Sequence, residues 1–468
     1  MAKRNEAEIK AKLGEEKFNF MQRFNEIIKH PSKHLFTDGK FDPAKLSALY
    51  NEFADLYLKG DLKGKIPDSK FPKISVQKLT MLPPGSKNSK TSGGNYNRQY
   101  NFVEINAEHY YGKGDKVLAA LIIKELATVC HEYQHFKQNL YATGKIQDSK
   151  IPTGDFNAAE VEENNKTMIE LTPEQLEIAK GMLGENPEEI KADFLYGDQK
   201  NRLIDISRSI APSAYAAGEK KARGSKILGI IKNPLKILYT NGKEPLYAAH
   251  YLLRPYEIDA RDTSIAHFDI FIRDFQTFSH GKSRDISTAL KVMSNLQKAA
   301  NWWDKHKQPK EAMEVFMEEA RKTISPEMIV EYLSSEQFET VAGERKPLPQ
   351  DKKEMIVIRS VTVLIESFSP EKQSDFLKRL EGVPKEVVEQ IKANIAEKNQ
   401  SASTSTKTYV TSAEIDNERS KYPESQQESQ SGKAETRTRE ETSERDKTPD
   451  ELALEEMQEM GPRPHYDD

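Results

Sequence analysis

The sequence has only one cysteine, Cys130, among its 468 residues. A disulfide framework within the chain is therefore excluded, and this cysteine usage suits a reducing compartment. No stretch is long and apolar enough to predict a membrane span. Residues 1–6 lead directly into a charged segment that lacks the apolar core of a secretory signal. Together these absences predict a soluble, cytoplasmic protein without a membrane partner.

An excess of positive charge is also missing. The chain carries 70 Lys and Arg residues against 74 Asp and Glu residues, which gives a net charge of -4. This balance gives no reason to expect nucleic acid as a partner. Apolar residues are scarce as well, at 36% of the chain with a mean hydropathy of -0.75. Such a low value indicates that part of the chain is disordered.

Composition and periodicity divide the chain into four parts, and the predicted fold class is mainly α with a small β-sheet (α+β). The parts are N-terminal helices over 1–60, a domain containing the sheet over 61–280, a helical bundle over 281–398, and a disordered tail with a short terminal helix over 399–468. The terminal helix is amphipathic, and it could dock a partner or serve as a targeting signal.

Local patterns add expectations for individual segments. We expect one helix over 5–29, another capped by Asp42, strands over 73–81 and 96–106, a capping box at Thr172 with Gln175, a loop over 211–226, and a helix over 226–239 interrupted at Pro234. The run from 283 to 398 reads as a series of short helices, and Trp302 and Trp303 are expected to be core or interface anchors.

One segment, residues 115–144, carries the chemistry. Asp115 is a candidate N-cap, Gly144 is a natural helix stop, and apolar residues recur between them at helical spacing. The segment contains His131, Glu132 and His135 in the pattern H-E-x-x-H. Two histidines one turn apart point the same way, so both imidazoles can bind one metal, and the glutamate can deprotonate a water held there.

A catalytic zinc needs a third protein ligand. The extended motif with a third histidine on the same helix is absent, because Phe136 to Tyr141 lack the required Gly and His. The best candidate is Glu257, at the start of a helix that Pro255 is expected to restart. Ala260 is small enough to let that helix approach closely. Other possible ligands in the same stretch are His250, Asp259, Asp262 and His267.

With these residues the chain resembles the gluzincin class of zinc metallopeptidases, in which H-E-x-x-H is followed later by E-x-x-A. The resemblance implies a zincin-like core, Zn²⁺ as cofactor, His131, His135 and Glu257 as ligands, and Glu132 as general base. It also implies hydrolysis of a peptide bond in a protein or peptide substrate, as an endopeptidase. The strand over 96–106 could then form the rim of the cleft and pair with an extended peptide.

The sequence departs from this class at one position. Members often carry Asp four residues after the ligand glutamate, to orient the first histidine. Arg261 stands there, so the orienting role is open between Asp259, Asp262 and neither. Candidate donors to the oxyanion are Tyr256, His250, Tyr251 and Arg261. Cys130 is expected to be a small core residue rather than a ligand.

Two other functions are compatible with the sequence. The chain could keep a zincin-like fold without turnover and use its helical bundle and tail to hold partners. It could also be a metallopeptidase effector delivered into another cell or compartment, with residues 448–468 as the export signal.

Overall fold

The computed structural model describes residues 6–79, 93–152, 158–196, 198–223, 245–279, 290–291, 294, 308–341 and 344–406. The predictions for the helix over 226–239, for Trp302 and Trp303, and for the tail from 407 onward lie outside these residues. Within the described part of the chain, no helix combines the length and apolar character needed to cross a bilayer.

The N-terminal segment is helical, as expected, but its first helix is broken in two. The elements are α1 (Glu6–Leu13), α2 (Glu15–Lys29), α3 (Pro31–Leu35), β1 (Phe36–Thr37), β2 (Lys40–Phe41) and α4 (Pro43–Tyr57). Gly14 lies between α1 and α2 with a φ of 80°, which ends the first helix, so the single helix over 5–29 was wrong. The expected cap of α4 is confirmed, because the Asp42 side chain accepts a hydrogen bond from the Ala44 N–H.

A small sheet has the strand order β3-β5-β4, with β3 at Lys73–Gln77, β4 at Gly94–Asn97 and β5 at Phe102–Asn106. Strands β3 and β5 are parallel, whereas β4 is antiparallel to β5 and lies at the edge. The single strand expected over 96–106 was therefore wrong, because the chain reverses between β4 and β5. Asn101 has a φ of 50° in this turn, a conformation that asparagine tolerates well.

Helix α5 (Asp115–Thr143) contributes much of the first hydrophobic core. Its N-cap is Gly114 rather than Asp115, whose carboxylate instead accepts a hydrogen bond from the Ser32 N–H at 3.0 Å. Its end is as expected: Gly144 has a φ of 64°, and its N–H bonds to the Leu140 carbonyl.

Helix α13 (Pro255–Ser279) packs along α5, and Pro255 begins it, as expected. Its aromatic residues Phe271 and Phe275 meet Phe24 of α2 edge to face, with ring centroids 5.1 and 5.5 Å apart. Ala260 is fully buried. The packing of α13 therefore fixes where its first turn lies relative to α5.

The other elements are mostly helices. They are β6 (Lys145–Ile146), α6 (Ala158–Asn165), β7 (Ile169–Glu170), α7 (Pro173–Gly181), α8 (Pro187–Tyr196), α9 (Asp198–Ile210), α10 (Pro212–Arg223), α12 (Pro245–Leu252), α15 (Gln308–Thr323), α16 (Pro326–Ser334), β8 (Phe338–Val341), β9 (Glu344–Pro347), α17 (Gln350–Ile365), α18 (Pro370–Lys378) and α19 (Lys385–Thr406). The capping box at Thr172 and Gln175 is confirmed at the start of α7.

Three expectations for this part were wrong. Residues 211–226 were expected to form a loop, but Pro212–Arg223 is α10, whose small residues allow it to pack tightly against α15. The run from 283 to 398 was expected to contain helices alone, but it includes the antiparallel hairpin of β8 and β9. Helix α19 continues to Thr406, beyond the expected start of the tail at 399.

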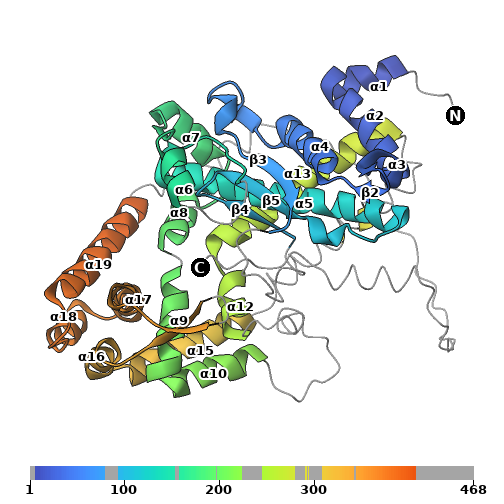
Figure 1. Ribbon diagram of the computed structural model, residues 1–468. Helices are drawn as coiled ribbons and strands as arrows, with labels where there is room; N and C mark the ends of the chain where they lie inside the picture. The colour runs from blue at the N-terminus through green and yellow to red at the C-terminus, as the bar shows by residue number, and fades with distance from the viewer. Residues whose placement is uncertain are drawn as a thin grey trace, which may run out of the picture.

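The described residues form two hydrophobic cores. The first combines α2, α4, the sheet, α5, α7 and α13, and the second combines α9, α10, α12 and α15 to α19. Figure 1 shows the second group of helices gathered on one side of the molecule, away from α2 and α4. The fold is thus mainly helical with small sheets, as the α+β class requires, and the division at residues 60 and 280 stays a prediction.

Candidate metal centre

The two histidines of the motif lie one turn apart on α5 and face the same space. Their Nε2 atoms are 3.2 Å apart, and their rings meet edge to face with centroids 4.7 Å apart. The side chains of His131 and His135 are only 15% and 10% exposed, so water has little access to them. Neighbouring Cys130 is buried in the first core, as expected.

The carboxylate of Glu257 completes a cluster of three. From the first turn of α13, its two oxygens lie 3.3 Å from Nε2 of His131 and 3.7 Å from Nε2 of His135. Three ligands about 2.1 Å from a tetrahedral metal lie about 3.4 Å from one another. Among the described residues this is the group of His, Cys, Asp and Glu side chains that could hold a metal ion. The spacing of the three side chains fits such an ion.

Burial and mutual contacts shift the pKa values of the three clustered side chains in different directions. Burial opposes the charge of Glu257, but His135 and a hydrogen bond with His131 hold its pKa well below the usual range. Burial lowers the pKa of His135 to about 4. For His131 the contact with Glu257 outweighs burial and raises the pKa. The cluster therefore supplies an ionised carboxylate and, in His135, a neutral imidazole, the forms in which these groups bind metals.

Glu132 is held beside the cluster by the sheet. Its Oε2 accepts a hydrogen bond of 2.9 Å from the backbone N–H of Tyr96, on the edge strand β4. The side chain is buried, and its negative charge contributes to the raised pKa of His131. The edge strand β4 and helix α5 thus meet at the carboxylate of Glu132.

Two tyrosines, one on α12 and one in the first turn of α13, contact the cluster. The Tyr251 hydroxyl, on α12, donates a hydrogen bond to Oε2 of Glu257. The Tyr256 ring lies 4.8 Å from the ring of His135, and the guanidinium of Arg254 covers the same tyrosine ring at 4.1 Å. Tyr251 was considered as an oxyanion donor, but here it orients the carboxylate of Glu257.

Asp259, one of the two aspartates considered for the orienting role, is linked to His135 through the side chain of Gln138. Asp259 accepts a 2.6 Å hydrogen bond from Nε2 of Gln138, whose Oε1 lies 2.7 Å from Nδ1 of His135. The side chain of Asp262 is 57% exposed and pairs with Arg261 at 3.6 Å. The positive charge of Arg261 partly opposes the rise in the pKa of His131, so this arginine lies near the cluster.

The two alternative histidine ligands have other partners. Nδ1 of His250 lies 2.7 Å from Oδ1 of Asn201, and its pKa is lowered well below the usual value by burial. Nε2 of His267 lies 3.3 Å from Nζ of Lys137. Neither belongs to the cluster of possible ligands found among the described residues.

Two residues that contact the motif, Tyr96 and Gln138, were not predicted from the sequence as part of the site. No sequence pattern predicts the hydrogen bond from the Tyr96 N–H to the Glu132 carboxylate. Gln138 lies one turn beyond His135, so its place on the same helix face was a usable signal.

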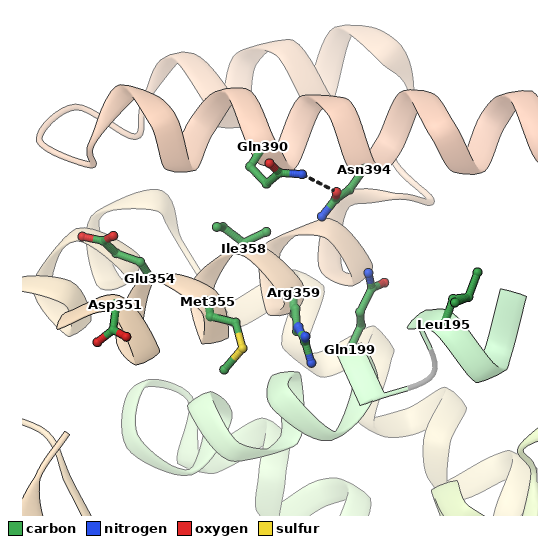
Figure 2. Close-up of a pocket in the computed structure, with 9 residues that line it drawn as sticks. All are labelled: Leu195, Gln199, Asp351, Glu354, Met355, Ile358, Arg359, Gln390 and Asn394. Atoms are coloured by element: carbon green, nitrogen blue, oxygen red, sulfur yellow. Dashed lines mark hydrogen bonds between the residues drawn. The ribbon is translucent and has the colours of Figure 1, made fainter. Parts of the chain in front are cut away.

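A separate cavity of about 400 Å³ lies among α8, α9, α17 and α19 (Figure 2). Gln199 and Arg359 line it, and on α19 Gln390 donates a 3.0 Å hydrogen bond to Asn394. None of the clustered side chains lines this cavity. It is therefore distinct from the candidate metal centre.

Comparisons with models of protein families, with curated proteins and with solved structures found no match to the chain. The candidate function therefore has to be argued from the geometry and chemistry of the cluster.

Proposed function

We propose that the protein is a zinc metallopeptidase with a zincin-like core made of the small sheet, α5 and α13. The observation that carries this function is the convergence of Nε2 of His131, Nε2 of His135 and the carboxylate of Glu257 at separations of 3.2 to 3.7 Å. Two imidazoles and one carboxylate are a common ligand set of catalytic zinc, which keeps a fourth position open.

Within this function, His131, His135 and Glu257 hold the metal, and Tyr251 orients the Glu257 carboxylate. Bound zinc would polarise the peptide carbonyl and lower the pKa of a water molecule. Glu132 would accept a proton from the attacking water and deliver it to the leaving amine. Its hydrogen bond from the Tyr96 N–H holds one carboxylate oxygen in a fixed position.

Strand β4 is suited to hold the substrate, because it lies at the edge of the sheet and contacts the general base. An extended peptide could pair with this edge through its backbone. Among the donors considered for the oxyanion, Tyr251 bonds to Glu257 and His250 contacts Asn201. Tyr256 and Arg261 remain as candidates beside the ligands.

The test is zinc content and proteolysis of the purified chain and of Glu132→Gln. We expect one zinc per chain in both proteins and cleavage of a casein or peptide library by the original chain. We expect the variant to lose most of this activity, about 10²–10⁴-fold, since general-base catalysis contributes about that much. Zinc in both proteins with equal or absent cleavage would favour a non-catalytic scaffold, and absence of zinc would contradict the function.

A further inference from the structure

Gln138 makes three hydrogen-bond contacts that leave its amide no choice of orientation. It is buried on α5, with its Nε2 atom 2.6 Å from Oδ2 of Asp259 and 2.7 Å from the Tyr256 carbonyl oxygen. Its Oε1 atom lies 2.7 Å from Nδ1 of His135. A backbone carbonyl oxygen can only accept a hydrogen bond, so the atom that faces the Tyr256 carbonyl must be the amide nitrogen.

This orientation determines the tautomer of His135. The amide oxygen faces Nδ1, and an oxygen of this kind only accepts, so Nδ1 must carry the hydrogen. In the neutral imidazole, Nε2 then keeps its lone pair. Nε2 is the atom that faces His131 and Glu257. The ring is thus presented with its metal-binding atom toward the cluster.

Asp259 holds the nitrogen of the Gln138 amide, whose oxygen faces His135. Besides Gln138, its Oδ2 accepts a 2.9 Å hydrogen bond from Nε2 of Gln134, and its Oδ1 accepts a 2.7 Å bond from the Gly184 N–H. Asp259 is buried, and three donors from two segments of chain hold its carboxylate in place. Asp259 thus contacts the amide that faces the second histidine of the motif, whereas the gluzincin pattern predicts an aspartate beside the first histidine.

We propose that Gln138 is a positioning residue which selects the metal-binding tautomer of His135, and that Asp259 acts on this histidine through Gln138. The tautomer can be examined without metal, whereas the consequence for zinc rests on the function proposed above. Outer-shell partners of this kind are worth about 10–100-fold in metal affinity.

Gln134 offers a matched control. It lies one turn before Gln138 on α5, is fully buried, and donates to the same Asp259 oxygen and to the Met182 carbonyl at 3.0 Å. None of these hydrogen bonds involves His135. A leucine at either position removes comparable buried hydrogen bonds, but only Gln138→Leu removes the partner of the imidazole.

The first experiment measures the tautomer of His135 in metal-free protein by NMR with ¹⁵N-labelled histidine, assigned with His135→Asn. We expect the Nδ1–H form in the original chain and in Gln134→Leu, and a shift toward the Nε2–H form in Gln138→Leu. Gln138→Met, which keeps an unbranched side chain, serves the same purpose if leucine unfolds the protein. An unchanged tautomer in the Gln138 variants would overturn the proposal.

The second experiment measures zinc affinity by competition with a chromophoric chelator. We expect about 10–100-fold weaker binding in Gln138→Leu, and a clearly smaller loss in Gln134→Leu, which removes one of the three donors to Asp259 but keeps the contact between Gln138 and His135. Equal losses in the two variants would show a general structural effect and overturn the positioning role. If the original chain binds no zinc, the proposed function fails, but the tautomer measurement still decides the role of Gln138.

A double substitution tests the path from Asp259. Asp259→Asn alone should weaken zinc binding, because it disturbs the amide of Gln138. In the Gln138→Leu background the same change should have little further effect on zinc affinity, since the amide that links Asp259 to His135 is already absent. Full additivity of the two losses would show that Asp259 acts on the metal by another path, which contradicts the second half of the proposal.

Discussion

The carboxylate of Glu257 lies 3.3 Å from Nε2 of His131, although the two residues belong to different helices, α13 and α5. Their separation depends on how α13 packs along α5, with Ala260 fully buried one turn beyond Glu257. The candidate metal centre is therefore a product of helix packing as well as of the local motif. Changes at Glu257 or at its contacts should alter metal binding without changing α5 itself.

Glu257→Ala should reduce zinc affinity by more than about 100-fold, because even the loss of an outer-shell partner costs about 10–100-fold. Competition with a chromophoric chelator measures this. The control is Asp262→Asn, which removes an exposed carboxylate from the same helix and should leave the affinity unchanged. Equal affinities for Glu257→Ala and the original chain would remove Glu257 from the ligand set.

Tyr251→Phe should weaken zinc binding by about tenfold, because the carboxylate of Glu257 loses the hydroxyl that orients it. Tyr247→Phe is a matched control on the same helix, since its hydroxyl donates to Asp205, away from the cluster. Isothermal calorimetry on both variants measures the difference. A larger loss in the control than in Tyr251→Phe would mean that the orienting contact is unimportant.

Lys137→Met should stabilise the protein at pH 7 by about 1–3 kcal/mol, because burying a charged amine costs more than burying a thioether. The Lys137 side chain is buried beside His267, and burial lowers its pKa to about 8. Urea denaturation gives the free energy of unfolding. Exposed Lys116 on the same helix is the control, and Lys116→Met should change stability by less than about 0.5 kcal/mol. Destabilisation by Lys137→Met would show that the amine is well solvated by its surroundings.

Gly218→Ala should destabilise the second core by about 1–3 kcal/mol, although alanine normally favours a helix. A Cβ at this position in α10 would meet the Cβ of Phe316 at 2.8 Å and both δ-methyl groups of Leu246 at 3.0 Å. Gly181→Ala at the end of α7 is the control, because its added Cβ would meet no atom within 4 Å apart from its chain neighbours and the nearby backbone of α7. Thermal unfolding of the two variants should shift in opposite directions, and a stable Gly218→Ala would argue against the close approach of α10 to α15.

The parts of the fold that depend on local chemistry were predictable from the sequence. The end of α5 at Gly144 and the cap of α4 by Asp42 follow from backbone conformation and side-chain hydrogen bonding within a few residues. Helix α10 was missed because its small and basic residues include few large apolar side chains, and its stability comes from packing on α15. The turn at Asn101 was missed because apolar residues continue on both sides of it.

In the candidate site, too, the residues of the local motif were predictable and those brought in by helix packing were not. The motif placed His131, Glu132 and His135 on one helix, and helix geometry alone brings the two imidazoles together. Glu257 could be named as a candidate, but His250 and Asp262 could not be separated from it until the path of α13 was known. The role of Gln138 depends on Asp259 and the Tyr256 carbonyl arriving from α13, which no local pattern encodes.

The most direct test is a crystal of the protein grown with zinc, with diffraction recorded on both sides of the zinc absorption edge. We expect one anomalous peak per chain, about 2.1 Å from Nε2 of His131, Nε2 of His135 and a carboxylate oxygen of Glu257. A zinc-loaded crystal without a peak among these three side chains, or with its peak elsewhere, would contradict the metal centre and the hydrolase function with it.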